Sequence, residues 1–257
     1  LRTMSRSRTY KTEAVVLKQT PLGEADRILT LFAPDIGKVR AVGKGVRRIK
    51  SRLGGHLELL NLVDVSLYSG RNLDVIQEAQ AVRTFQGFKE DLSRLSRALY
   101  IAELVESVTA EWSASDALYG VLVSSLDWLE RDGQPDLLVR HFEIQLLGHS
   151  GYRPELYQCV ECRSRLEPDD HMFSCASGGV LCPTCRVRSG EALVPVALNT
   201  MKVLRFLQQR ARYDDVTGLK VSARQMAQIE RLTRNYIRFL LERELKSVEF
   251  MDRVRSG

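Results

Sequence analysis

Two short C-x-x-C motifs constrain this 257-residue sequence more than any other feature. The first is Cys159-Val160-Glu161-Cys162, and the second, after 19 intervening residues, is Cys182-Pro183-Thr184-Cys185. Two thiolate pairs at this spacing can close a tetrahedral metal site, and zinc is the metal that such sets usually hold. A redox-active C-x-x-C motif normally occurs alone after a strand. The sequence therefore predicts one zinc ion per chain, with ligands Cys159, Cys162, Cys182 and Cys185.

A shell of four thiolates leaves no open position for water, so we expect a structural zinc and not a catalytic one. The fifth cysteine, Cys175, lies in a segment that suggests a short hairpin, and we interpret it as a small buried thiol. His171 is an alternative ligand in place of one cysteine. The arginines that flank the motifs are either phosphate contacts or solvated surface: Arg163, Arg165, Arg186 and Arg188.

The N-terminal part of the chain alternates apolar and polar residues with a period of two, which is typical of strands. Short strands are expected at 14–17, 27–32, 38–42, 62–68 and 73–76, with turn residues between them. Five short strands favour a small closed barrel, and the OB-fold is the five-stranded barrel most associated with nucleic acids. An SH3-like barrel or half of a sandwich would give much the same pattern.

From Asp91 onward the apolar residues recur with the period of a helix. Two expected buried faces are Leu92, Leu95, Leu99, Ala102 and Val105, and then Leu118, Val121, Leu122, Ser125, Leu126 and Leu129. Ser222 and Gln225 have the spacing of a capping box before another helix. The predicted fold is α+β: a flexible N-terminus (1–9), a five-stranded OB-fold β-barrel (10–86), and an α-helical domain (87–257) interrupted by a zinc-ribbon-like insert (155–190).

Positive charge is concentrated in the N-terminal part of the chain. Up to Gln86 the sequence has 15 lysines and arginines against 8 acidic residues, which leaves 23 against 24 for the remainder. The stretch from Ile36 to Leu57 holds no acidic residue, and its cations form what we call the basic segment: Lys38, Arg40, Lys44, Arg47, Arg48, Lys50 and Arg52. Such an excess favours the phosphates of a nucleic acid. A solvated loop without a ligand and an anionic membrane surface are the alternatives.

No set of residues indicates catalysis, so we do not expect an enzyme. Gly45 stands where a phosphate-binding loop needs Ser or Thr, and the four histidines are scattered. The apolar runs are too short to cross a bilayer, and no apolar segment of signal-peptide length follows the basic first eleven residues. We therefore expect a cytoplasmic protein without membrane contact, in which Met4 is the start and Leu1–Thr3 are a remnant or an upstream extension.

Several segments together resemble the RecO family of bacterial DNA repair proteins. They are YKTEAVVL (10–17), GEADR (23–27), GKGVRR (43–48), the two cysteine motifs and LERELKS (241–247). The resemblance implies an OB-fold, a helical domain and a zinc insert with the four cysteines named above. It also implies a mediator that binds single- and double-stranded DNA and anneals complementary strands. With RecR, such a mediator helps load RecA onto strands coated by single-strand binding protein, in the cytoplasm at the nucleoid.

The resemblance does not identify the residues that contact DNA, so the basic segment is chosen on charge and strand position alone. Tyr68 and Phe32 are the aromatic residues expected near this sheet, and we expect phosphate contacts to outweigh base stacking. Two other functions fit the same residues. One is a zinc-ribbon interaction adaptor whose basic barrel only assists, and the other is an RNA-binding OB protein.

Overall fold

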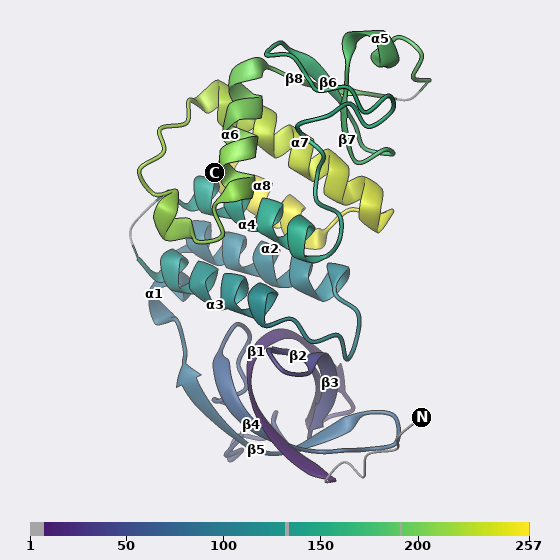
Figure 1. Ribbon diagram of the computed structural model, residues 1–257. Coiled ribbons are helices and arrows are strands. Elements are labelled where there is room, and N and C mark those ends of the chain that lie inside the picture. Colours follow the sequence, from purple (N-terminus) through teal and green to yellow (C-terminus); the bar gives the residue numbers. More distant parts are fainter. Residues whose placement is uncertain (1–7, 132–133, 191, 257) are drawn as a thin grey trace. The chain divides into compact units, whose positions relative to one another are not determined.

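The computed structural model describes residues 8–131, 134–190 and 192–256 (Figure 1). The chain divides into two compact units, one formed by residues 1–130 and 253–257 and the other by residues 131–252. The expected flexible N-terminus falls largely outside the described residues, and the first strand begins at Thr9.

Five strands of the first unit form a closed barrel (Figure 1). They are β1 (Thr9–Leu22), β2 (Asp26–Ala33), β3 (Gly37–Gly43), β4 (Leu62–Tyr68) and β5 (Asp74–Arg83). The order around the barrel is β1-β2-β3-β5-β4, in which only β3 and β5 are parallel. This arrangement confirms the predicted OB-like barrel. The strands other than β4 are longer than the alternation suggested, because pairing continues past the residues that face the core.

Side chains that alternate along the strands build the barrel interior, with register shifts where β1 pairs with β2 and β4 with β5. The inward residues are small or branched and almost fully buried; they include Ala14, Val16, Leu29, Leu31, Val39, Ala41, Val63, Val65 and Ile76. Because Val39 and Ala41 point inward, Lys38 and Arg40 on the same strand point to the other side, as the sequence predicted.

Three helices complete the first unit: α1 (Gln86–Lys89), α2 (Leu92–Val108) and α3 (Asp116–Glu130). The predicted buried face of α3 is confirmed at every position. The predicted face of α2 is partly wrong, since Leu92 is 63% exposed while Ile101 and Leu104 are buried. Apolar residues surround more than one side of α2, so its packing against β1 and α3 decides which side is buried.

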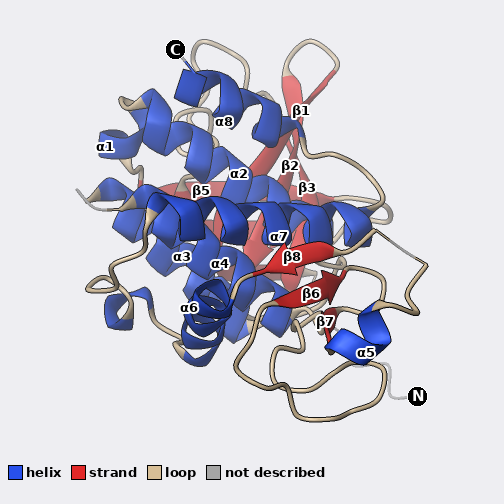
Figure 2. Ribbon diagram, turned by 90° about the horizontal axis from the view of Figure 1, so that it is seen from above, coloured by secondary structure: helices blue, strands red, loops and turns tan. Residues whose placement is uncertain are grey.

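The second unit consists of helices and a small sheet. Its helices are α4 (Pro135–His149), α5 (Pro183–Arg186), α6 (Leu198–Gln209), the 3₁₀ turn η1 (Tyr213–Asp215), α7 (Ala223–Leu241) and most of α8 (Lys246–Ser256). The sheet has the order β7-β6-β8, from β6 (His171–Ser174), β7 (Gly179–Leu181) and β8 (Val194–Val196). Figure 2 shows β8 beside α7, which it contacts. The predicted capping box at Ser222 and Gln225 is present.

Helix α4 lies at the centre of this unit and packs against α6 and α7. Every side chain from Leu137 to Leu147 is buried, including an ion pair in which Arg140 Nη2 lies 3.2 Å from Glu143 Oε1. His141 is also buried, and its Nε2 lies 2.7 Å from the backbone oxygen of Arg210. None of the helices in the described part of the chain is long and apolar enough to cross a membrane.

Candidate nucleic-acid interface and metal centre

The basic segment begins within β3, at Lys38 and Arg40, and continues into the loop between β3 and β4. Its exposed cations are Arg40, Lys44, Arg47, Arg48, Lys50 and Arg52. Among the residues that the structure describes, none of these six forms an ion pair with an acidic side chain. Their charge is therefore available to an external anion.

Lys38 differs from the other cations of the basic segment because α2 partly covers it. Its Nζ donates to the backbone oxygen of Glu106 at 2.6 Å, and its own backbone oxygen accepts from Trp112 N at 2.9 Å. Burial in this contact lowers the pKa of Lys38 below its ordinary value. Lys38 thus joins α2 to the barrel, and the exposed cations of the basic segment begin at Arg40.

Of the two aromatic rings expected near a bound nucleic acid, one is covered by a helix of the same unit and is not accessible. Phe32 is fully buried, with its ring centroid 6.3 Å from that of Tyr119 on α3, so the expectation that it offers an accessible ring is wrong. Tyr119 also donates to Glu13 Oε1 at 2.8 Å. Tyr68, at the end of β4, remains partly exposed.

The loop that carries the basic segment is fixed to the barrel at its first turn. Asp26 Oδ1 accepts from the backbone N–H of Gly45 at 2.7 Å, and Arg47 N donates to the oxygen of Ala25 at 3.0 Å. The side chain of Val46 between them is buried in the barrel core. The backbone of Arg47 is therefore held on the barrel while its charged side chain is exposed.

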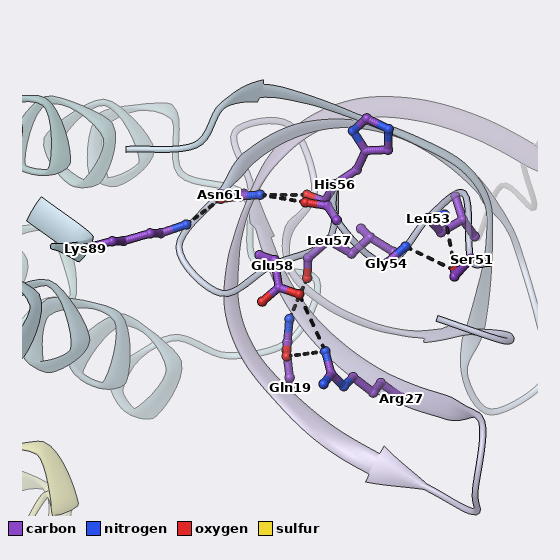
Figure 3. A network of polar contacts seen from close by, with 11 residues as sticks. Gln19, Arg27, Ser51, Leu53, Gly54, His56, Leu57, Glu58, Asn61 and Lys89 are labelled. Carbon is purple, nitrogen blue, oxygen red and sulfur yellow. Dashed lines mark hydrogen bonds and ion pairs between the residues drawn. The ribbon is translucent and has the colours of Figure 1, made fainter. Parts of the chain in front are cut away.

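A polar network fixes the other end of the loop, as Figure 3 shows. Gln19 Nε2 donates to the backbone oxygen of Leu57 at 2.5 Å, and Arg27 Nη1 donates to Gln19 Oε1 at 2.8 Å. Arg27 also faces Glu58 across 4.0 Å. Since the Leu57 side chain belongs to the barrel core, this end of the loop is held by both packing and hydrogen bonds.

Asn61 extends the network to the helices of the same unit (Figure 3). Its Nδ2 donates to the backbone oxygens of His56 at 2.9 Å and Gly55 at 3.4 Å. Its Oδ1 accepts from Lys89 Nζ at 2.6 Å, and burial lowers the pKa of Lys89. These anchoring residues are not evident from the sequence, because nothing in a one-dimensional pattern places them beside the loop.

The four predicted zinc ligands come together in the second unit. All four Sγ atoms lie within 4.8 Å of one another, and those of Cys162 and Cys182 are 3.8 Å apart. Two sulfurs bound to one tetrahedral zinc at ~2.3 Å would be about 3.8 Å apart. The first pair lies in a tight turn in which Cys159 N donates to Ser164 O at 2.8 Å, and the second pair opens α5.

The pKa values of the clustered thiols shift in opposite directions, because hydrogen bonds lower some of them while burial and neighbouring thiols raise another. The hydrogen bond with Ser164 is the main reason why the pKa of Cys162 falls to about 6. The backbone N–H of Cys185 lowers the pKa of Cys182. The pKa of Cys185 itself rises to about 11: a hydrogen bond from Arg188 opposes the rise, while burial and the neighbouring thiols cause it. Four thiolates this close repel one another, so the donor set fits a soft divalent cation between them.

The remaining candidate ligands lie apart from this group. Cys175 follows β6 in the predicted hairpin with β7 and is not one of the clustered cysteines. It is only partly buried, so the expectation of a buried thiol is wrong. His171 is not in the cluster either, and its Nε2 contacts the backbone oxygen of Glu167 at 2.8 Å. The cysteine cluster therefore consists of the four residues that the two motifs predicted.

Comparison with known proteins gives matches over nearly the whole chain. Residues 4–85 match the family described as Recombination protein O N terminal, and residues 89–249 match Recombination protein O C terminal. A DNA repair protein RecO from Dehalococcoides mccartyi (strain CBDB1) is 38% identical over 98% of this chain and 98% of its own length. The DNA repair protein RecO of Roseiflexus sp. (strain RS-1) is 37% identical over 97% of this chain and 87% of its own length. That of Symbiobacterium thermophilum is 35% identical over 96% of this chain and 98% of its own length.

Proposed function

This chain belongs to the RecO family of DNA repair proteins, and from that premise we propose that it is a recombination mediator that acts by binding, without catalysing a covalent reaction. In this proposal it binds single- and double-stranded DNA and anneals complementary strands. With RecR, it helps load RecA onto strands coated by single-strand binding protein, in the cytoplasm at the nucleoid.

One observation carries the DNA-binding part of the proposal: six exposed cations, none of them in an ion pair among the described residues, follow one another from β3 into an anchored loop of an OB-like barrel. Annealing brings two polyanions together, and a cationic surface lowers their mutual repulsion. No acidic residue occurs from Ile36 to Leu57, so the segment itself adds no negative charge that would repel a strand. Phosphate contacts of this kind read no sequence, which suits a protein that must act on any damaged site.

We propose that the cysteine cluster holds one zinc ion with a structural role. Cys159, Cys162, Cys182 and Cys185 supply a complete set of thiolate ligands, so a bound metal would keep no position for water or substrate. The metal would contribute folding free energy by joining the turn at Cys159 to α5. Its removal should loosen the insert and leave the barrel folded, because the barrel has a core of its own.

Charge reversal tests the proposed DNA site. The triple variant Lys44→Glu, Arg47→Glu and Arg48→Glu should weaken binding to single-stranded oligonucleotides of every sequence alike, by about a hundredfold or more at low salt. The matched control reverses three exposed cations of the second unit, Lys202→Glu, Lys220→Glu and Arg224→Glu, with the same change in net charge.

Fluorescence anisotropy of labelled DNA measures both variants, and circular dichroism checks that they are folded. If the barrel triple variant binds like the wild type, or if the control loses as much affinity, the assignment is wrong. The same titration with RNA of equal sequence separates DNA from RNA preference. Tighter binding of RNA would favour an RNA-binding OB protein instead.

A further inference from the structure

The basic loop between β3 and β4 also carries one exposed apolar side chain, which phosphate binding does not explain. Ile49 lies between Arg48 and Lys50, and its side chain is more exposed than any other large apolar side chain in the described part of the chain. Fully exposed isoleucine forgoes the free energy that burial would provide. Val46 and Leu57 are the side chains by which this loop contributes to the buried barrel core, and Ile49 is not part of that core.

The backbone holds Ile49 at the tip of a turn. Ser51 N donates to Arg48 O at 2.9 Å, which makes Ile49 and Lys50 the two central residues of a β-turn. The next turn is also fixed, because Ser51 Oγ accepts from the backbone N–H groups of Leu53 at 3.3 Å and Gly54 at 3.1 Å (Figure 3). The apolar tip therefore projects from a structured loop.

We infer that Ile49 contacts nucleobases of single-stranded DNA while the neighbouring cations hold the phosphates, an inference that rests on the proposed DNA-binding function. In several proteins that bind duplex DNA, apolar side chains wedge between bases, and the unstacking of the base step costs free energy. Here the cations on both sides would bring the backbone to the loop tip, and the unstacked bases of a single strand expose apolar faces to it. A stacked duplex hides those faces, so Ile49 favours single strands over double strands.

The test compares two oligonucleotides of equal length and charge, one with bases and one abasic throughout. Ile49→Ala should weaken binding to the normal strand by about threefold to tenfold and leave the abasic strand unchanged. The dependence of binding on salt should keep its slope, because no phosphate contact is lost. Ile49→Trp should restore or exceed wild-type affinity for the normal strand, since an indole stacks on bases.

Leu92→Ala is the matched control, because Leu92 is an exposed leucine of the same unit at the start of α2. It should change neither affinity. Since Ile49 contributes nothing to the core, its variants should melt at the wild-type temperature. If Ile49→Ala loses equal affinity for both strands, Ile49 only shapes the loop. If it loses affinity for neither strand, Ile49 makes no contact with DNA. Either result overturns the inference.

Two further measurements distinguish the base contact of Ile49 from the DNA site as a whole and from a membrane ligand. If the charge-reversed triple variant binds both strands normally, the proposed DNA site itself fails; if it loses both strands while Ile49→Ala loses neither, only the inference fails. A basic loop with an apolar tip could also enter an anionic membrane. Sedimentation with phosphatidylglycerol vesicles that depends on Ile49, together with unchanged DNA affinity of Ile49→Ala, would overturn the base contact in favour of a lipid surface.

Discussion

The ammonium group of Lys38 donates to the backbone oxygen of Glu106 at 2.6 Å, although Lys38 lies on the same side of β3 as the exposed Arg40. The two cations are separated by one residue, yet Lys38 joins α2 to the barrel and Arg40 is exposed. Position on the strand therefore does not decide which cations can bind a phosphate. The helix that covers one end of β3 makes the difference.

Substitution of these two residues should separate stability from DNA binding. Lys38→Met removes a hydrogen bond from a half-buried charge and should lower the free energy of unfolding by ~1 kcal/mol, with DNA affinity unchanged. Arg40→Ala should leave stability unchanged and weaken DNA binding. Urea unfolding and anisotropy measure the two effects; a larger loss of DNA affinity in the folded Lys38→Met protein than in Arg40→Ala would reverse the assignment.

Much of the fold could be predicted from local patterns. The alternation of Val39 and Ala41 with Lys38 and Arg40 identified a strand and its two faces, because a strand has a period of two whatever surrounds it. The buried face of α3 and the capping box at Ser222 depend on residues three or four apart. Such features need no knowledge of distant segments.

The errors came from contacts between distant segments. Phe32 is covered by Tyr119, and the buried side of α2 is chosen by the barrel and α3. The four clustered cysteines are the exception, since their spacing alone predicted that they would come together across 19 intervening residues. A metal site imposes its own geometry on the sequence, whereas packing between a helix and a barrel leaves no comparable motif.

Salt should weaken DNA binding in proportion to the number of phosphates contacted. If about five of the exposed cations bind phosphates, the log–log slope for single strands is roughly −3.5, which is about a hundredfold between 50 and 200 mM salt. Titrations at four salt concentrations give this slope. The triple charge-reversal variant should flatten it; a slope near zero for the wild type would show that phosphate contacts do not dominate.

Zinc content should depend on the clustered cysteines and not on Cys175. Elemental analysis should find about one zinc per chain in the wild type and in Cys175→Ser, and little in Cys159→Ser. Chelation should lower the melting temperature while the barrel still binds DNA. Full zinc content in Cys159→Ser would disprove the ligand set, and a metal-dependent turnover lost in a folded variant would disprove the structural role.

Acid should destabilise the second unit through His141. Burial lowers the pKa of His141 below its ordinary value of 6.5, although the hydrogen bond to the Arg210 backbone oxygen opposes this shift. As the pH falls, His141 therefore takes up a proton in the unfolded chain before it does so in the folded protein. The free energy of unfolding decreases as the pH drops below about 6.5, and it stops decreasing once the pH reaches the lower pKa of the folded state. This contribution is fully present at higher pH.

Urea unfolding at pH 7, 6 and 5 measures the effect, which cannot exceed about 1.4 kcal/mol per pH unit for one group. His141→Gln should lose much of the pH dependence. His149→Gln, at an exposed position on the same helix, should retain it. Equal pH dependence in all three proteins would show that His141 is not responsible.

We propose that the anchored basic loop of this RecO-family chain lets it anneal DNA and act on coated strands. The most direct measurement is the annealing rate of two complementary oligonucleotides, bare and coated with single-strand binding protein, at two salt concentrations. We predict acceleration that salt weakens, that persists on coated strands, and that the Lys44, Arg47 and Arg48 charge reversal abolishes. DNA binding without acceleration of annealing, or acceleration that survives the charge reversal, would contradict the account and favour an interaction adaptor.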